Sequence, residues 1–180
     1  TGDERDPCML CYTSGTTGNP KGVLYEHRST FLHAITGLQP AIFDFDARSV
    51  MLPVVPMFHA ASWGLPWAGA AAGIKFVFSA VNDAAVLCDL MNREKVTHSA
   101  GVPTVWLATF KHMDETGTTL PTLRQAIIGG SAAPRFMIER LMKAGVNVAH
   151  AWGMTETSPI GTTGAKTWDW DDRSFEDQVT

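Results

Sequence analysis

The sequence has no excess of basic residues. Of its 180 residues, 14 are Lys or Arg and 18 are Asp or Glu, which gives a formal net charge of −4 at pH 7. A protein that binds nucleic acid needs clustered Lys and Arg to neutralise the phosphates. The charge balance therefore argues against a nucleic-acid partner.

Long hydrophobic runs are also lacking. The most apolar stretch, residues 58–73, contains His59 and Pro66, and it is shorter than the roughly 20 apolar residues that a membrane-spanning helix needs. The first residues, TGDERDP, are polar and charged, unlike a secretory signal peptide. We therefore expect no transmembrane segment and a cytoplasmic location.

Cysteine is scarce. The three cysteines, Cys8, Cys11 and Cys88, cannot all pair with one another. Cys8 and Cys11 have the spacing of a redox or metal motif, but they lie in an expected strand, where residues three apart point to opposite faces. No second Cys or His pair follows at zinc-like spacing. We therefore favour structural, reduced thiols, as in a reducing cytoplasm.

Hydrophobic residues make up 45% of the chain, and their spacing predicts strands and helices that alternate. The expected strands are residues 8–13, 50–55, 74–79, 97–102, 123–128 and 147–152. The expected helices are residues 26–42, 60–72, 82–94, 103–113 and 134–143. This order predicts an α/β fold with a mainly parallel sheet flanked by helices. The pattern disappears from Gly161 onward, so we expect residues 161–180 to form a loop or a frayed end.

Ligands of such sheets bind at the carboxyl ends of the strands, and the stretch YTSGTTGNPKG, residues 12–22, follows the first expected strand. Its glycines let the backbone approach an anion closely, and Lys21 adds a positive charge. Hydroxyl and backbone donors come from Thr13, Ser14, Gly15, Thr16, Thr17 and Gly18. An ordinary Gly/Ser/Thr turn is the alternative, but a bias of this length favours a loop that binds a polyphosphate.

This loop is not a Walker A motif. That motif requires Gly-Lys-Ser/Thr at the start of a helix, whereas Lys21 lies between Pro20 and Gly22 and no hydroxyl follows it. A P-loop phosphotransferase is therefore the least favoured alternative.

Three more unusual stretches follow expected strands. In AWGMTETSP, residues 151–159, Trp152 could stack on a purine, Thr155 could bind phosphate and Glu156 could bind Mg²⁺. The small residues of GGSAAP, residues 129–134, leave room for a planar base. In PMFHAASWGLP, residues 56–66, His59 and Trp63 fit core packing as well as a substrate site, and both interpretations remain open at this point.

Together these motifs resemble, in content and order, the adenylate-forming superfamily of acyl-CoA synthetases, luciferases and peptide-synthetase adenylation domains. The resemblance covers residues 8–160. PMFHAASWGLP, AGVPTVW (residues 100–106) and GGSAAPR most resemble medium- and long-chain fatty-acyl-CoA ligases. A peptide-synthetase adenylation domain and a luciferase-like enzyme are the alternatives within the superfamily.

The resemblance implies a two-step reaction that uses ATP, Mg²⁺ and coenzyme A. ATP and a fatty acid give acyl-AMP and pyrophosphate, and coenzyme A then takes the acyl group as a thioester. The expected partners are therefore small molecules, and the resemblance leaves open whether the parent enzyme is a homodimer.

The resemblance also implies roles for particular residues. Thr13 and Glu156 would hold Mg²⁺, and Lys21 with the hydroxyl-rich loop would bind the β- and γ-phosphates. His59 would lie near the acyl carboxylate, and Trp63 matches a gating aromatic of the acyl tunnel. Residues implied to bind AMP are Gly130, Ser131, Ala132, Ala151, Trp152, Gly153 and Thr155. Residues implied to line the tunnel are Gly101, Val102, Pro103 and Thr104.

The chain departs from the family pattern in sequence and in length. Trp152 stands where many members have Tyr, and His150 stands where Gln or another polar residue is common, which leaves the role of His150 open. Family enzymes are considerably longer. We therefore expect residues 1–180 to be a fragment of the large N-terminal domain, without the C-terminal domain and its catalytic Lys, and inactive in isolation.

Overall fold

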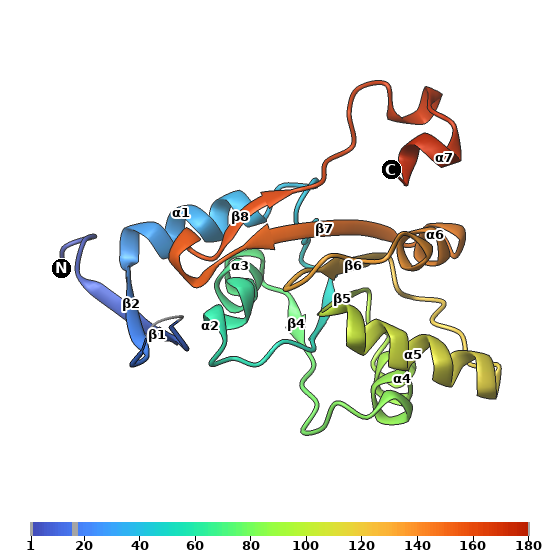
Figure 1. Cartoon of the computed structure of the whole chain (residues 1–180), viewed down its shortest axis with the longest axis horizontal. Coiled ribbons are helices and arrows are strands. Elements are labelled where there is room, and N and C mark those ends of the chain that lie inside the picture. Colours follow the sequence, from blue (N-terminus) through green and yellow to red (C-terminus); the bar gives the residue numbers. More distant parts are fainter. Residues whose placement is uncertain (1, 16–17, 180) are drawn as a thin grey trace.

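The computed structural model describes residues 2–15 and 18–179 (Figure 1). The predictions for Thr16 and Thr17 therefore lie outside the described residues.

A six-stranded sheet forms the centre of the protein, with the strand order β4-β3-β5-β6-β7-β8. Its strands are β3 (Val50–Pro53), β4 (Lys75–Phe76), β5 (His98–Gly101), β6 (Gln125–Ile128), β7 (Asn147–Gly153) and β8 (Ile160–Thr163). The first five strands pair in parallel, and β8 is antiparallel to β7. This arrangement confirms the predicted α/β fold with a mainly parallel sheet.

Helices cover both faces of this sheet. They are α1 (His27–Gly37), α3 (Leu65–Ala72), α4 (Ala84–Arg93), α5 (Pro103–Thr116) and α6 (Arg135–Lys143). Ile127 of β6 packs in the same cluster as Ala34 of α1 and Leu65 of α3. Its neighbour Ile128 packs with α5 and α6 around Trp106. Successive strand residues thus point to opposite layers, and each fully buried aliphatic side chain contributes roughly 1.5–3 kcal/mol.

The first two strands form a separate antiparallel hairpin, β1 (Pro7–Thr13) with β2 (Lys21–Glu26). In Figure 1 this blue hairpin lies at one end of the molecule, next to α1. The predicted strand at residues 8–13 is therefore present, but β2 was expected to be loop and helix start. Strand β2 is defined by pairing with β1, which the spacing of its own apolar residues does not reveal.

The predicted helix at residues 60–72 is wrong in its first part. The short element α2 (Ala60–Trp63) has φ between 45° and 58°, which is a left-handed turn, and α3 begins only after Gly64. Left-handed backbone costs roughly 1–2 kcal/mol for each non-glycine residue. Burial of all four side chains of α2 and a 2.9 Å hydrogen bond from Ser62 Oγ to the Val55 carbonyl offset this cost.

The prediction of a loop or frayed end at residues 161–180 is wrong where β8 enters this range and pairs with β7. The 3₁₀ turn η2 (Trp170–Asp172) and the short helix α7 (Phe175–Gln178) follow, and Val179 is buried. Pairing with an existing edge strand stabilises β8 without the local periodicity that sequence analysis requires. Within residues 2–15 and 18–179, no helix is both long and apolar enough to cross a membrane.

Candidate functional site

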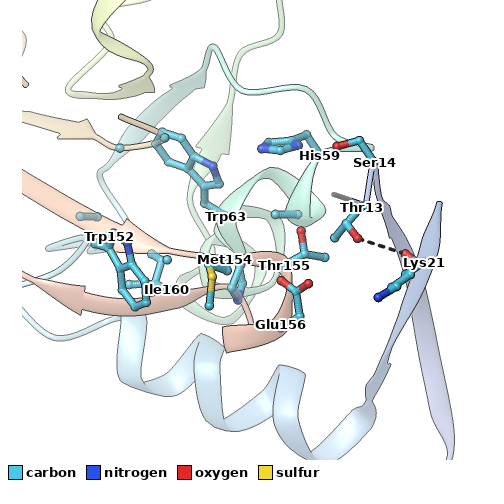
Figure 2. Close-up of a pocket in the computed structure, with 17 residues that line it drawn as sticks. Thr13, Ser14, Lys21, His59, Trp63, Trp152, Met154, Thr155, Glu156 and Ile160 are labelled. Carbon is cyan, nitrogen blue, oxygen red and sulfur yellow. Dashed lines mark hydrogen bonds between the residues drawn. The ribbon is translucent and has the colours of Figure 1, made fainter. Parts of the chain in front are cut away.

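A cavity of about 420 Å³ lies between the loop end of the β1–β2 hairpin and the carboxyl ends of β6 and β7 (Figure 2). Its lining residues come from all the stretches that follow expected strands. They are Thr13, Ser14, Gly15, Lys21, His59, Ala60, Trp63, Gly129, Gly130, Ala151, Trp152, Gly153, Met154, Thr155, Glu156, Pro159 and Ile160. The volume is within the range of about 300–1,000 Å³ that is usual for sites of small molecules.

The hairpin supplies the cationic side of this cavity. Thr13 and Lys21 are the last paired residues of β1 and β2, and Thr13 Oγ1 donates a 3.5 Å hydrogen bond to the Lys21 carbonyl. This bond closes the base of the loop that follows β1 (Figure 2). No ion pair of Lys21 is found among the described residues. The lysine charge is therefore available to an anionic ligand.

Glycines form the opposite wall. A Cβ atom on Gly129 would lie 3.1 Å from the Ala151 carbonyl and 3.3 Å from the Trp63 ring. A Cβ atom on Gly153 would lie only 2.1 Å from the Pro159 carbonyl. Larger residues would therefore push these segments apart. Trp152 also lines the cavity and is 56% exposed, so its aromatic surface is accessible to a planar group.

The turn after β7 holds the acidic residue of the cavity. This turn is the 3₁₀ element η1 (Thr155–Thr157), and the buried Tyr25 hydroxyl of β2 donates a hydrogen bond to the Thr155 carbonyl. Burial, followed by the proximity of Cys11 and Glu156, raises the pKa of Tyr25 to about 12. The phenol therefore keeps its proton at neutral pH and remains a donor.

His59 and Trp63 lie at the two ends of the left-handed turn. His59 is exposed and lines the cavity near Ser14 (Figure 2). Trp63 lines the same cavity but is only 7% exposed and belongs to the main hydrophobic core. Trp63 is thus part of the core and of the cavity wall at once, because its ring packs against Gly129; the implied gating role stays a prediction.

Comparison with known proteins identifies the family. The model of the AMP-binding enzyme family matches residues 1–178. The chain belongs to the AMP-binding enzyme family.

Curated relatives are similar over most of this chain. It is 48% identical over 162 residues to the medium-chain-fatty-acid–CoA ligase of Ectopseudomonas oleovorans, which covers 89% of this chain and 30% of that protein. It is 47% identical over 158 residues to the long-chain-fatty-acid–CoA ligase of Thermus thermophilus, covering 87% and 29% of the two chains. The chain thus spans about 30% of the length of the curated relatives it matches.

Solved structures of this family have the same fold. The N-terminal domain of FACL13 from Mycobacterium tuberculosis superimposes with a TM-score of 0.76 at 29% identity, covering 87% of this chain and 39% of that one. O-succinylbenzoate coenzyme A synthetase from Bacillus subtilis, solved in complex with ATP and a magnesium ion, gives a TM-score of 0.76 at 26% identity, covering 91% and 33%.

The oxygen donors of the AMP-binding chain fit a magnesium ion that arrives with a nucleotide. Thr13 and Glu156 line the same cavity, and Mg²⁺ in nucleotide sites is commonly held by one or two protein oxygens together with substrate phosphates and water. In the described part of the chain, no group of three or more His, Cys, Asp or Glu residues could hold a metal ion. The hydroxyl and carboxylate oxygens of Thr13 and Glu156 therefore suit Mg²⁺ that is bound together with ATP.

Some predicted site residues lie away from the cavity. Those that do not line it are Gly18, Gly101, Val102, Pro103, Thr104, Ser131 and Ala132. Val102 still borders the site, because its Cγ1 lies 2.9 Å from the position of a Cβ on Gly130. Thr104 lies exposed on α5, since this helix begins at Pro103 and turns its second residue outward.

Sequence analysis did not assign five lining residues: Ala60, Gly129, Met154, Pro159 and Ile160. Gly129 and Met154 stand inside the GGSAAP and AWGMTETSP motifs, so adjacency to the assigned residues could have indicated them. Ile160 enters the wall through the pairing of β8 with β7, and no local pattern signals that pairing.

His150 has a contact that suggests its role. Its Nε2 accepts a 3.3 Å hydrogen bond from the backbone N–H of Ala133. The side chain does not line the 420 Å³ cavity. The His150 side chain therefore holds the loop after β6 through the Ala133 N–H and does not face the cavity.

Proposed function

We propose that this chain carries the ATP-binding part of an ATP-dependent fatty-acyl-CoA ligase. The observation that supports this proposal most is the convergence of three groups on one cavity: Lys21 at the end of the hairpin, the glycine wall after β6, and Glu156 after β7. The names of the curated relatives supply the substrate class, a medium- or long-chain fatty acid and coenzyme A.

In the first step, a carboxylate oxygen attacks the α-phosphorus of ATP. A bond forms between that oxygen and the phosphorus, the bond from the α-phosphorus to the bridging oxygen breaks, and pyrophosphate leaves. Both reactants are negatively charged, so the site must neutralise charge as they approach. In the second step, the sulfur of coenzyme A attacks the acyl carbon, its thiol proton is lost, and AMP leaves.

In the first step, different residues of this chain would bind the phosphates, the adenine, the carboxylate and the metal ion. Lys21, Ser14 and Gly15 would hold the β- and γ-phosphates, and Trp152 would stack on the adenine. His59, on the neighbouring wall, would orient the carboxylate. Thr13 and Glu156 would hold Mg²⁺, which when bound supplies positive charge against the phosphates.

The expected partners of the parent protein are small molecules: ATP, a carboxylic acid and coenzyme A. We place the parent protein in the cytoplasm, where these substrates are available. The acyl length stays open, because a relative that is 47% identical over 163 residues, from Ruegeria pomeroyi, is named 3-methylmercaptopropionyl-CoA ligase.

Glu156→Gln in the full-length protein tests the proposed metal role. Wild-type protein is expected to exchange labelled pyrophosphate into ATP only when a carboxylic acid is present. The variant keeps the size of the side chain but loses its charge, so exchange should fall by about 100-fold or more, since metal-held charge stabilisation is worth several kcal/mol. The affinity for the fatty acid, measured separately by calorimetry, should change little.

Glu115→Gln is the matched control. Glu115 lies exposed on α5 and does not line the cavity, so the same chemical change there should leave exchange unaltered. If Glu156→Gln exchanged pyrophosphate at the wild-type rate at saturating Mg²⁺, the proposed role of Glu156 in metal binding would be wrong.

A further inference from the structure

The hairpin that carries Thr13 and Lys21 needs an anchor. In the described part of the chain, it forms a two-stranded sheet of its own and shares no ladder with the six-stranded sheet. An isolated two-stranded hairpin is at best marginally stable in water. The position of Lys21 relative to the end of β7 therefore depends on how the hairpin is attached to the rest of the protein.

The two faces of the hairpin differ. One face presents Cys11, Val23 and Tyr25, which pack in a small cluster with Ala61 of the left-handed turn. Lys21 shares this face of β2 with Tyr25, since alternate residues of a strand point to the same side. The other face carries exposed apolar side chains, which include Tyr12 at 65% exposure.

Tyr25 connects the hairpin to the turn after β7. It is 4% exposed, and its hydroxyl donates to the Thr155 carbonyl, which lies 130 residues later in the sequence. That carbonyl belongs to the peptide group that joins Thr155 to Glu156. Because a peptide group is planar, a hydrogen bond to its oxygen fixes the orientation of the plane from which Glu156 projects.

The hydroxyl thus connects two parts of the cavity. On one side it belongs to the strand that presents Lys21, and on the other it holds the turn that presents Glu156. Both of these side chains line the cavity, whereas Tyr25 does not.

We infer that Tyr25 is a positioning residue that sets the distance between the phosphate-binding hairpin and the metal-binding carboxylate of Glu156. This inference rests on the proposed function, because it assumes that Lys21 and Glu156 act on one nucleotide. It adds a role for a residue that touches neither the nucleotide nor the metal.

Tyr25→Phe in the full-length enzyme tests the inference. The ring keeps its packing against Cys11 and Ala61, but the Thr155 carbonyl loses its hydroxyl partner. A displacement of a catalytic group by about 1 Å can lower the rate by about 100-fold. If Glu156 shifts relative to Lys21, we expect the rate of pyrophosphate exchange to fall by about 10- to 100-fold. The Mg²⁺ concentration for half-maximal rate should rise, whereas KM for the carboxylate should stay constant.

Hydrogen–deuterium exchange gives a second readout that needs no turnover. In the nucleotide-free variant, amides of η1 and of the β1–β2 hairpin should exchange faster than in the wild type. Amides of β3, β5 and β6 in the central sheet should exchange at the wild-type rate, and the melting temperature should stay close to that of the wild type.

Thr122→Val is the matched control. It also removes a hydroxyl that donates to a backbone carbonyl distant in sequence, that of Val96 at 2.9 Å, but Thr122 does not line the cavity. We expect wild-type pyrophosphate exchange, wild-type Mg²⁺ dependence and wild-type deuterium exchange in η1 and the hairpin.

Three results would overturn the inference. Wild-type Mg²⁺ dependence and wild-type deuterium exchange in Tyr25→Phe would show that the hydroxyl positions nothing. A uniform loss of stability, with a parallel rise in KM for the carboxylate, would reduce Tyr25 to a packing residue. Equal effects of Thr122→Val would show that the loss of any such hydrogen bond impairs the reaction, with no special role for Tyr25. If the wild-type enzyme did not exchange pyrophosphate into ATP, the proposed function would fail. Hydrogen–deuterium exchange would still test whether Tyr25 holds the hairpin to the η1 turn.

Discussion

At the scale of single residues, Trp63 shows how one side chain serves core and cavity together. Its backbone is in the left-handed region, with φ of 58°, and its ring lies between the main core and Gly129. A residue in this position cannot swing out without leaving a void, because protein interiors are close-packed. We therefore regard any change in its rotamer as coupled to a change in the surrounding core.

Trp63→Ala should lower the free energy of unfolding by about 3–5 kcal/mol, since a large aromatic side chain is removed from a packed site. The same change enlarges the cavity, so the preference among fatty acids of increasing length should also shift, by about 10- to 200-fold per methylene group at most. Denaturant unfolding and kcat/KM across a chain-length series measure the two effects.

Trp168→Ala serves as the control for Trp63, because Trp168 is almost fully exposed. That variant should keep wild-type stability and acyl preference. Unchanged stability of Trp63→Ala would contradict its place in the core, and an unchanged chain-length profile would contradict its place at the acyl site.

At the scale of secondary-structure elements, a row of polar side chains lies across the central sheet. His98, Gln125 and Asn147 are register partners on β5, β6 and β7, and Asn147 Nδ2 donates to Gln125 Oε1 at 2.6 Å. His98 Nε2 lies 3.2 Å from the Asp44 carbonyl, and Gln125 Nε2 donates to the Ile42 carbonyl at 3.1 Å. This row therefore ties the segment after α1 to the sheet.

A second histidine joins α1 to β8. His33 Nε2 accepts a 3.2 Å hydrogen bond from the Ile160 N–H, so the neutral imidazole is the form that makes this contact. Burial lowers the pKa of His33, and burial together with the charge of Arg124 lowers the pKa of His98.

These lowered pKa values predict how stability depends on pH. Below about pH 6.5, the ordinary pKa of histidine, the imidazoles of the unfolded chain take up protons while the buried ones stay neutral. The unfolded state then binds more protons, so the free energy of unfolding decreases as the pH falls. Urea unfolding between pH 5.5 and pH 8 should show full stability at the upper end and a decline below about 6.5.

His98→Gln should reduce the slope of this decline, because its amide can still donate to the Asp44 carbonyl but does not titrate. A wild-type free energy of unfolding that stays constant from pH 8 to pH 5.5 would contradict this account of the two histidines.

Sequence analysis identified the strands and helices that their own residue pattern predicts. It missed the strands that form only by pairing with a strand elsewhere in the chain. The predicted strands at residues 50–55, 97–102, 123–128 and 147–152 overlap β3, β5, β6 and β7 of the structure. β2 and β8 exist through pairing with β1 and β7, which a local pattern does not reveal. The left-handed turn of α2 was also missed, since hydrophobic periodicity carries no information about the handedness of a single turn.

The candidate site was predictable to a similar extent. The motifs placed Lys21, Trp152 and Glu156 in one site, and all three line the cavity. The hydrogen bond from the Tyr25 hydroxyl to the Thr155 carbonyl was not predictable from the sequence. It joins residues 130 positions apart, and no sequence motif links a tyrosine to a backbone carbonyl at such a distance.

At the scale of the whole molecule, the cavity lies where two substructures meet. The central sheet contributes the strand ends with Trp152 and Glu156, and the separate hairpin contributes Thr13 and Lys21 (Figure 2). In parallel α/β sheets, ligands bind at the carboxyl ends of the strands. Here the added hairpin brings the cationic Lys21 to that edge, opposite Trp152 and Glu156 in the same cavity.

The proposed reaction is the transfer of the adenylyl group of ATP to a carboxylate. Transfer of oxygen-18 from a labelled fatty acid tests it directly in the full-length protein. When the carboxylate attacks the α-phosphorus and coenzyme A then takes the acyl group, one carboxylate oxygen remains on AMP. Mass spectrometry of the products should therefore find one oxygen-18 atom in AMP and none in pyrophosphate. Label in inorganic phosphate, with ADP as the nucleotide product, would contradict the account and indicate attack on the γ-phosphorus instead.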